Sequence, residues 1–266
     1  MPAEWYPHAA TQLHWPSNPE TWPDERLPRV ESVYLEIIEL LHRYEPIHLF
    51  VEDNEVYRRV LNLFENRDIN LDRVTFHLQP INDVWARDCG PIFIRQNDNH
   101  DVFAITDWEY NAWGGKYPPY DDDNHLPKYM AEKFGIQRFE PGMVLEGGSI
   151  ESNGDGVLMT TESVLLNPNR NPDMSKADIE QRLKEYLGVQ QVIWLNRGLA
   201  GDDTDGHIDD IARFLNPSTI LLMQVEDPED VNYDALKENL EILKEATNQH
   251  GNTFAIETLP AAQHPH

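Results

Sequence analysis

The 266-residue sequence contains a single cysteine, Cys89. One thiol excludes an intramolecular disulfide framework and a cysteine-rich zinc site. The sequence also lacks a basic stretch followed by an apolar one at its start, and no run of about 18 apolar residues occurs anywhere. Neither a signal peptide nor a membrane-spanning helix is therefore expected, and the sequence predicts a soluble cytoplasmic protein.

Basic residues are scarce as well. Twenty-one Lys and Arg face 47 Asp and Glu, which gives a formal net charge of −26. Such a charge repels nucleic acid and anionic membranes and raises the local concentration of cations. We therefore expect no nucleic-acid partner and no membrane partner, and any small-molecule substrate is expected to be cationic. A merely well-solvated acidic surface would explain the same charge.

No Ser/Gly-rich or Pro-rich linker divides the chain, so residues 1–266 are predicted to form one domain. Apolar residues recur with helical spacing in five segments and flank turn residues in three hairpins. The predicted helices are 26–43, 54–65, 124–134, 175–187 and 233–248. The predicted hairpins are GPIFIRQNDNHDVFAITDW, GGSIESNGDGVLMTT and IARFLNPSTILLM.

Each hairpin follows a polar cluster, and these clusters recur at similar intervals. Glu146 lies 58 residues after Asp88, and Asp209 lies 63 residues after Glu146. This spacing predicts an internal α/β repeat with an acid where each first strand begins. If such repeats surround a common axis, those strand starts meet at one mouth, where a site would be assembled.

The densest cluster is DTDGHIDDIARF, in which one histidine, His207, lies among four aspartates. His207 and Asp209 are two residues apart, so in an extended strand both side chains would share one face. A metal site, a hydrolytic acid/base pair, a cradle for a cation and a purely structural loop would each use such residues. Against a metal, no second histidine has a ligand-like spacing, and the fragment Asp203–Gly206 lacks the further ligands of a calcium loop.

Two other clusters favour recognition of a planar cation. In WARDCGP, Trp85 precedes Asp88 by three residues, and an aromatic face beside a carboxylate suits a guanidinium. Asp88, between Arg87 and the Gly-Pro turn, would also suit a structural ion pair or a turn residue. In LEGGSI, Glu146 precedes two glycines, where it could orient a histidine or only mark a tight packing site.

Together these segments resemble the agmatine deiminase family, a branch of the guanidino-modifying enzymes that includes the porphyromonad-type peptidylarginine deiminases. The resemblance covers nearly the whole chain. It rests on MPAEWYPHAATQLHWPSNPETWP, WARDCGPIFI, NAWGGKYPPYDDDN, LEGGSIESNGDG, LLNPNRNP and DDTDGHIDDIARF. It implies an α/β fold, the pseudo-fivefold α/β propeller (pentein) of repeated ββαβ-type modules, with the last module absent or incomplete in this sequence.

The resemblance also implies roles for the polar residues. Asp88 and Asp209 would hold the guanidinium through paired hydrogen bonds, His207 would be the general acid and base, and Glu146 would orient it. Trp85 would pack against the substrate.

Further positions match the family's motifs. Asp203 stands where the family has an acid, often Glu, that meets the distal amine of agmatine, and Trp113 would help to close the pocket. Asp205, Asp210 and Arg213 would support the site.

The implied reaction is hydrolysis of agmatine to N-carbamoylputrescine and ammonia through a covalent cysteine thiouronium intermediate, on a route to putrescine. No metal or organic cofactor is required. A related deiminase of free or peptidyl arginine and a non-catalytic guanidine-binding protein stay open as alternatives, as does assembly into homo-oligomers.

One feature departs from the family. The family's nucleophile comes from a G-x-x-H-C-type segment near the C-terminus of a longer chain, and these 266 residues contain no such segment. Strand alternation would point Cys89 away from the face that Asp88 presents. We therefore expect the 266-residue sequence to be inactive, either as part of a longer enzyme or as a binding protein.

Overall fold

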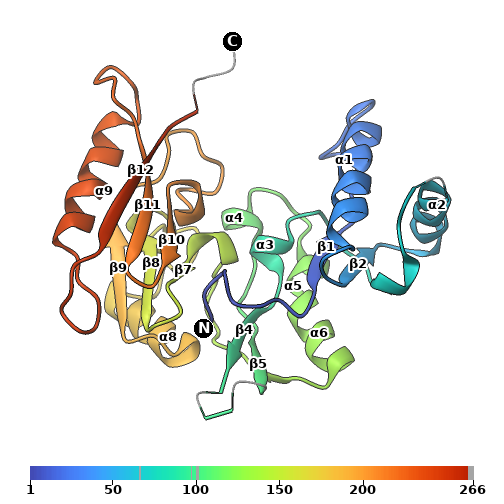
Figure 1. Cartoon of the computed structure of the whole chain (residues 1–266), viewed down its shortest axis with the longest axis horizontal. Helices are drawn as coiled ribbons and strands as arrows, with labels where there is room; N and C mark the ends of the chain where they lie inside the picture. Colours follow the sequence, from blue (N-terminus) through green and yellow to red (C-terminus); the bar gives the residue numbers. More distant parts are fainter. Residues whose placement is uncertain (66, 97, 100–101, 263–266) are drawn as a thin grey trace. The chain divides into compact units, whose positions relative to one another are not determined.

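The computed structural model describes residues 1–65, 67–96, 98–99 and 102–262 (Figure 1). These residues contain four three-stranded sheets. The chain divides into two compact units. The small unit comprises Tyr6–Gly90 and Pro119–Leu126, and the large unit comprises Met1–Trp5, Pro91–Pro118 and Pro127–His266.

The small unit is built on a parallel sheet of order β1-β2-β3. Its strands are β1 (Thr11–His14), β2 (Ile47–Val51) and β3 (Val74–Leu78). Its helical segments are α1 (Arg26–Leu41), α2 (Asn54–Phe64), η1 (Leu71–Arg73), α3 (Ala86–Cys89) and α5 (Asp121–Asn124). The apolar face of α1 buries Leu35 and Ile38 against Leu49 of the sheet, because parallel strands need helices to cover their faces.

The large unit repeats one pattern three times within its described residues: an antiparallel hairpin, helices, and a third strand parallel to the second. The first repeat contains β4 (Ile92–Arg95), β5 (Phe103–Thr106), α4 (Ala112–Gly115), α6 (Leu126–Phe134, whose first residue belongs to the small unit) and β6 (Gln137–Phe139). The second contains η2 (Gly147–Ser149), β7 (Glu151–Ser152), β8 (Val157–Thr161), α7 (Glu162–Leu165), α8 (Lys176–Leu187) and β9 (Gln191–Leu195). The third contains η3 (Ile208–Asp210), β10 (Ala212–Asn216), β11 (Thr219–Gln224), α9 (Tyr233–Glu245) and β12 (Ala255–Pro260).

These elements confirm the predicted helices, hairpins and internal repeat. One predicted helix, 124–134, is divided into α5 and α6 at His125. Figure 1 shows α9 lying along the sheet of the third repeat, where its Leu236 and Leu243 are fully or almost fully buried. The prediction of one domain over 1–266 stays a prediction.

The prediction that the polar clusters lie at the starts of strands is wrong in one respect. Each polar cluster folds as a single helical turn immediately before its hairpin: α3 before β4, η2 before β7 and η3 before β10. A turn of helix exposes backbone N–H groups and redirects the chain, so consecutive side chains diverge instead of alternating. The side-chain directions inferred from strand alternation therefore do not apply there.

No helix within the described residues is long and apolar enough to cross a membrane.

Candidate functional site

His207 lies just before the helical turn η3 and is 3% exposed. Its Nδ1 is 3.9 Å from Oδ1 of Asp209, whose side chain is 20% exposed. The two residues do come together, as predicted, but around a helical turn rather than along one face of a strand. A protonated His207 would be attracted to the Asp209 carboxylate. The same carboxylate can hold a positively charged group beside the imidazole, which can carry a proton.

The loop before His207 is tightly fixed. Gly206 has φ +111°, and a Cβ there would lie 2.2 Å from Oγ of Ser163, so the site requires glycine. The hydroxyl of Thr161 donates to the Gly206 carbonyl at 2.6 Å. The His207 N–H donates to Oγ1 of Thr204 at 3.1 Å. These bonds hold the imidazole's backbone in place.

Glu146 precedes η2 and is fully buried. Its Oε1 accepts from Nε of Arg170 at 2.6 Å, and both side chains are 0% exposed. Burial raises the pKa of Glu146, and the charge and hydrogen bond of Arg170 oppose that rise. Arg170 was not singled out from the sequence, although it lies within the LLNPNRNP motif.

Arg170 connects Glu146 to the loop that contains the predicted aspartates. Its Nη1 donates to Oδ2 of Asp205 at 2.8 Å, and its Nη2 donates to the Thr204 carbonyl at 3.0 Å. Asp205 also accepts from Lys116 at 2.7 Å and from Asn169 at 2.9 Å. Burial raises the pKa of Asp205, but the hydrogen bonds from Lys116, Asn169 and Arg170 outweigh burial and lower it. Asp205 is therefore an anion that joins Lys116, Asn169 and Arg170, and its supporting role in a site stays a prediction.

Asp203 and Trp113 belong to two loops that are joined to each other. The Tyr117 hydroxyl donates to Oδ2 of Asp203 at 2.8 Å, and Nζ of Lys116 donates to the Asp203 carbonyl at 2.5 Å. The Trp113 ring packs edge-to-face on Tyr117, with centroids 5.8 Å apart. Trp113 is 7% exposed and has φ +55°, an uncommon conformation for a bulky residue. Backbone strain of this kind is typical of functional loops.

The small unit contains the other two predicted residues. Trp85 precedes α3 and is 41% exposed, and Asp88 lies within α3 with intermediate exposure. The structure thus places His207, Asp209, Glu146, Asp203 and Trp113 in the large unit, and Trp85 and Asp88 in the small unit.

Cys89 is only 2% exposed, and its Sγ is 3.2 Å from the Trp85 carbonyl. Burial, together with the charges of Asp123 and Asp88, raises the pKa of the Cys89 thiol well above its usual value. A buried thiol that resists ionisation is a poor nucleophile. The reason given from strand alternation is wrong because Cys89 lies in a helical turn, but burial leads to the same expectation.

Asp210 and Arg213 have distinct environments. Burial, together with the charges of Asp209 and Asp202, raises the pKa of Asp210 to about 6.

Arg213 pairs through Nε with Oε2 of the buried Glu151 at 3.0 Å, while Oε1 of Glu151 accepts from the Phe214 N–H at 3.0 Å. Arg213 therefore links the hairpin that follows η3 to β7, and its supporting role in a site stays a prediction.

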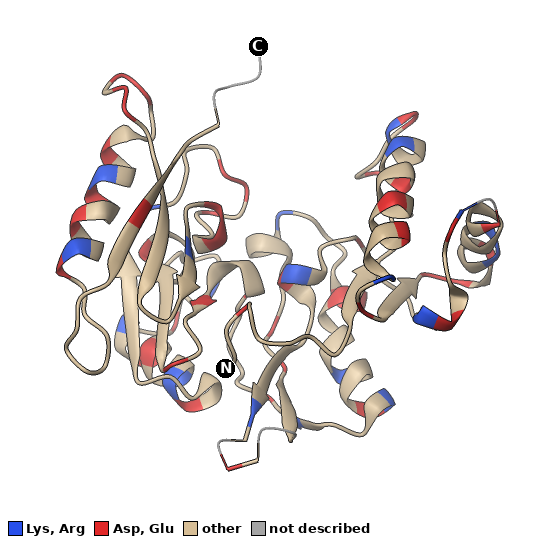
Figure 2. Cartoon of the chain, viewed as in Figure 1, with Lys and Arg blue, Asp and Glu red and all other residues tan. Residues whose placement is uncertain are grey.

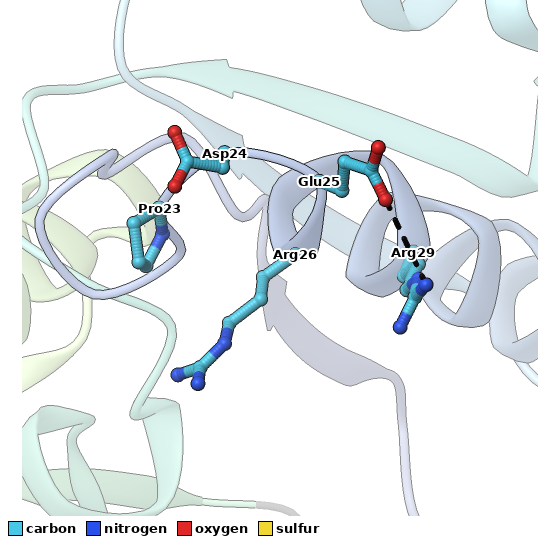
Figure 3. Close-up of a pocket in the computed structure, with 5 residues that line it drawn as sticks. All are labelled: Pro23, Asp24, Glu25, Arg26 and Arg29. Carbon is cyan, nitrogen blue, oxygen red and sulfur yellow. Dashed lines mark ion pairs between the residues drawn. The ribbon is translucent and has the colours of Figure 1, made fainter.

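A shallow hollow at the start of α1 is lined by Pro23, Asp24, Glu25, Arg26 and Arg29 (Figure 3). Its exposed Glu25–Arg29 pair spans 3.8 Å, and it contains none of the predicted site residues. Figure 2 shows Asp and Glu spread over helices and loops of both units rather than gathered on one element.

Comparison with known proteins identifies relatives of this chain. The family model for the Porphyromonas-type peptidyl-arginine deiminase matches residues 1–266. A Legionella pneumophila (strain Paris) protein named as a candidate agmatine deiminase is 40% identical over 259 residues, which are 97% of this chain and 72% of that protein. The agmatine deiminase of Pseudomonas aeruginosa (strain LESB58) is 35% identical over 98% of this chain and 70% of its own length.

Solved structures of agmatine deiminases have the same fold as this chain. The Enterococcus faecalis agmatine deiminase superposes with a TM-score of 0.88 at 31% identity, over 98% of this chain and 70% of that one. The C. jejuni agmatine deiminase, solved as a cysteine-to-serine variant with substrate bound, gives a TM-score of 0.83 at 32% identity, over 97% and 72% of the two chains. The predicted α/β fold class is thereby confirmed.

Proposed function

Because the chain belongs to the Porphyromonas-type peptidyl-arginine deiminase family and shares the fold of agmatine deiminases, we propose that its site binds agmatine for hydrolytic deimination. The observation that carries this proposal is the buried cluster around His207, Asp209 and Glu146. His207 lies 3.9 Å from the Asp209 carboxylate, and Arg170 connects the desolvated Glu146 carboxylate to the Thr204–Asp205 loop that precedes His207, all within one unit.

The proposed recognition uses charge. Asp209 accepts hydrogen bonds from the guanidinium, which keeps the planar group in place, and the resemblance of the WARDCGP motif assigns guanidinium binding to Asp88 as well. Trp85 supplies an aromatic face. Asp203, which already accepts from Tyr117, takes the distal amine of agmatine, and Trp113 closes over the aliphatic part.

The proposed chemistry has two halves. A cysteine thiolate attacks the guanidinium carbon, and ammonia leaves with a proton from His207, which gives a thiouronium intermediate. Water that gives a proton back to His207 then attacks the same carbon, the thiolate leaves, and N-carbamoylputrescine is released. Glu146 keeps the imidazole oriented. This reaction consumes one water and releases one ammonia.

We do not assign the nucleophile to Cys89, because that thiol is buried and its pKa is raised. The relatives are longer, and this chain spans 70 to 72% of those compared above. The proposal is that the attacking cysteine lies outside these 266 residues, so that the 266-residue chain binds guanidines without releasing ammonia.

Calorimetric binding and ammonia release test both parts. Agmatine should bind more tightly than arginine, because the acid-rich site repels the carboxylate of arginine. Asp209→Asn should weaken agmatine binding about 10-fold or more, since a hydrogen bond to a charged group contributes about 1.5–3 kcal/mol. Asp234→Asn, an equal loss of charge at an exposed position of α9, should leave binding unchanged.

Three results would overturn the assignment. Tighter binding of arginine would favour a deiminase of free arginine, and tighter binding of an arginyl peptide would favour peptidyl substrates. Ammonia release from agmatine by the 266-residue chain that persists in Cys89→Ala would show that the chain supplies another nucleophile.

A further inference from the structure

Three side chains with metal-ligating atoms meet inside the small unit, apart from the residues proposed for deimination. They are His14, Cys89 and Asp123, and one ligand atom from each lies within 4.8 Å of the other two. His14 is fully buried, and Cys89 and Asp123 are each 2% exposed. They come from β1, α3 and α5 (Figure 1), three segments far apart in the sequence. The fold, rather than any local motif, assembles them.

The bonds of His14 define which ring nitrogen could bind a metal. Nδ1 lies 3.2 Å from the carbonyl oxygen of Asp83, which can only accept, so Nδ1 carries the proton. Nε2 therefore carries the lone pair and accepts a hydrogen bond from the side-chain amide of Gln12 at 2.7 Å. A ring N–H donated to a backbone carbonyl is the usual arrangement behind a metal-bound imidazole.

Asp123 is also held by the backbone. Its Oδ1 accepts from the N–H groups of Asn82 at 2.7 Å and Asp83 at 3.4 Å. These bonds orient the carboxylate and do not use Oδ2. Cys89 Sγ lies against the Trp85 carbonyl at 3.2 Å, so only a weak hydrogen bond holds the thiol.

The electrostatics of the cluster favour a cation. Burial, ahead of the negative charges of Asp83 and Asp122, raises the pKa of Asp123 to about 7, and burial raises that of Cys89 well above its usual value. Burial also lowers the pKa of His14 to about 4. A divalent ion would balance one thiolate and one carboxylate and leave the imidazole neutral, which gives a buried site with no net charge.

We infer that the small unit binds one zinc-type divalent ion through Nε2 of His14, Sγ of Cys89 and a carboxylate oxygen of Asp123. Thiolate and imidazole ligands select zinc over magnesium or calcium. Metal–ligand bonds of about 2.0–2.3 Å place tetrahedral ligand atoms roughly 3.5 Å apart, so the side chains must approach by about an ångström. On binding, the Gln12 amide turns away and the Cys89 thiol releases its proton, so that the metal is held by a thiolate, a carboxylate and a neutral imidazole. This inference is independent of the proposed deimination.

The single cysteine makes the test specific. The 266-residue chain is stripped with a chelator, dialysed and titrated with ZnSO4 alone, and in parallel with CoCl2 alone. One ion per chain should bind, and Co²⁺ should produce a thiolate-to-metal charge-transfer band. Since Cys89 is the only thiol, that band can arise only from Cys89. Millimolar Mg²⁺ or Ca²⁺ should not displace the ion.

Variants separate this site from weak binding by surface acids and histidines. Cys89→Ser and His14→Gln should each weaken zinc binding at least 100-fold and abolish the rise of the unfolding temperature with zinc. His42→Gln is the matched control, because His42 is also buried in the small unit and bonds a backbone carbonyl, that of Asp68, at 2.8 Å. It should keep full stoichiometry.

Three results would overturn the inference: no zinc bound, zinc bound without a cobalt–thiolate band, or stoichiometric zinc that survives Cys89→Ser. If Cys89→Ser fails to fold, the intact chain decides the matter. In mild denaturant, zinc should slow the alkylation of Cys89 at least 10-fold, and an unchanged alkylation rate would contradict the site.

Discussion

Arg170 places a positive charge in the interior beside two carboxylates. Its side chain is 0% exposed, it pairs with Glu146 at 2.6 Å and with Asp205 at 2.8 Å, and it also donates to the Thr204 carbonyl. A buried charge is tolerated only when it is paired and fully hydrogen-bonded. Arg170 is therefore the residue that connects the carboxylate expected to orient His207 with the loop that precedes His207.

Removal of this guanidinium should be costly. Arg170→Met leaves Glu146 and Asp205 without their shared partner, and breaking one side of a buried ion pair costs about 3–5 kcal/mol. The free energy of unfolding, measured in urea, should fall by that amount. In Glu146→Gln/Arg170→Met the loss should be smaller than the sum of the two single losses, because no unpaired Glu146 carboxylate remains.

Arg197→Met is the comparison for that experiment. Arg197 pairs with Glu238 at 3.2 Å, but both side chains are about half exposed, and such pairs contribute less than about 1 kcal/mol. An Arg170→Met loss no larger than that of Arg197→Met would refute the structural importance assigned to Arg170.

At the scale of elements, the helical turns before the three hairpins decide where polar side chains point. Periodicity predicted the hairpins, since apolar strands and turn residues such as Asn153–Gly156 are local signals. Four-residue and three-residue helical turns have no such period, and alternation therefore failed at Cys89 and His207. Short turns of this kind are fixed by tertiary hydrogen bonds, which a single sequence does not display.

The loop that contains Trp113 offers a matched pair of glycines. Gly114 has φ +90°, and a Cβ there would lie 2.4 Å from Cγ of Asn169. Gly115 has φ +78° with nothing within 4 Å. Both substitutions to alanine strain the backbone, but only Gly114→Ala also displaces Asn169 from its bond to Asp205.

Gly114→Ala should therefore lower the free energy of unfolding by about 1–3 kcal/mol more than Gly115→Ala, whose cost should be about 1 kcal/mol. Chemical denaturation of both variants measures the difference. Equal losses of unfolding free energy would show that the Asn169 side chain moves aside at no cost, and that its close approach to Gly114 does not fix the loop.

At the scale of the whole molecule, the chain passes between the two compact units four times, after Trp5, Gly90, Pro118 and Leu126. Each passage restrains one unit when the other unfolds, so the covalent path favours cooperative unfolding.

Calorimetry should show one unfolding transition. Leu49→Ala in the small unit and Leu222→Ala in the large unit both remove a fully buried leucine, which costs about 2–5 kcal/mol. Each variant should shift the whole transition to lower temperature. Two transitions, each moved by only one of the variants, would contradict the single-domain prediction.

By itself, the sequence determined the helices, the hairpins, the repeat, the acidic charge and the family, because these depend on local periodicity, turn chemistry and motifs. It also indicated His207, Asp209 and Glu146. Only the tertiary structure decided that Arg170 joins Glu146 to Asp205, that Cys89 is buried, and that His14 and Asp123 meet it. The physical reason is that burial and pairing depend on contacts between distant segments, whose side chains acquire their pKa values and partners only once the sheets and helices have packed.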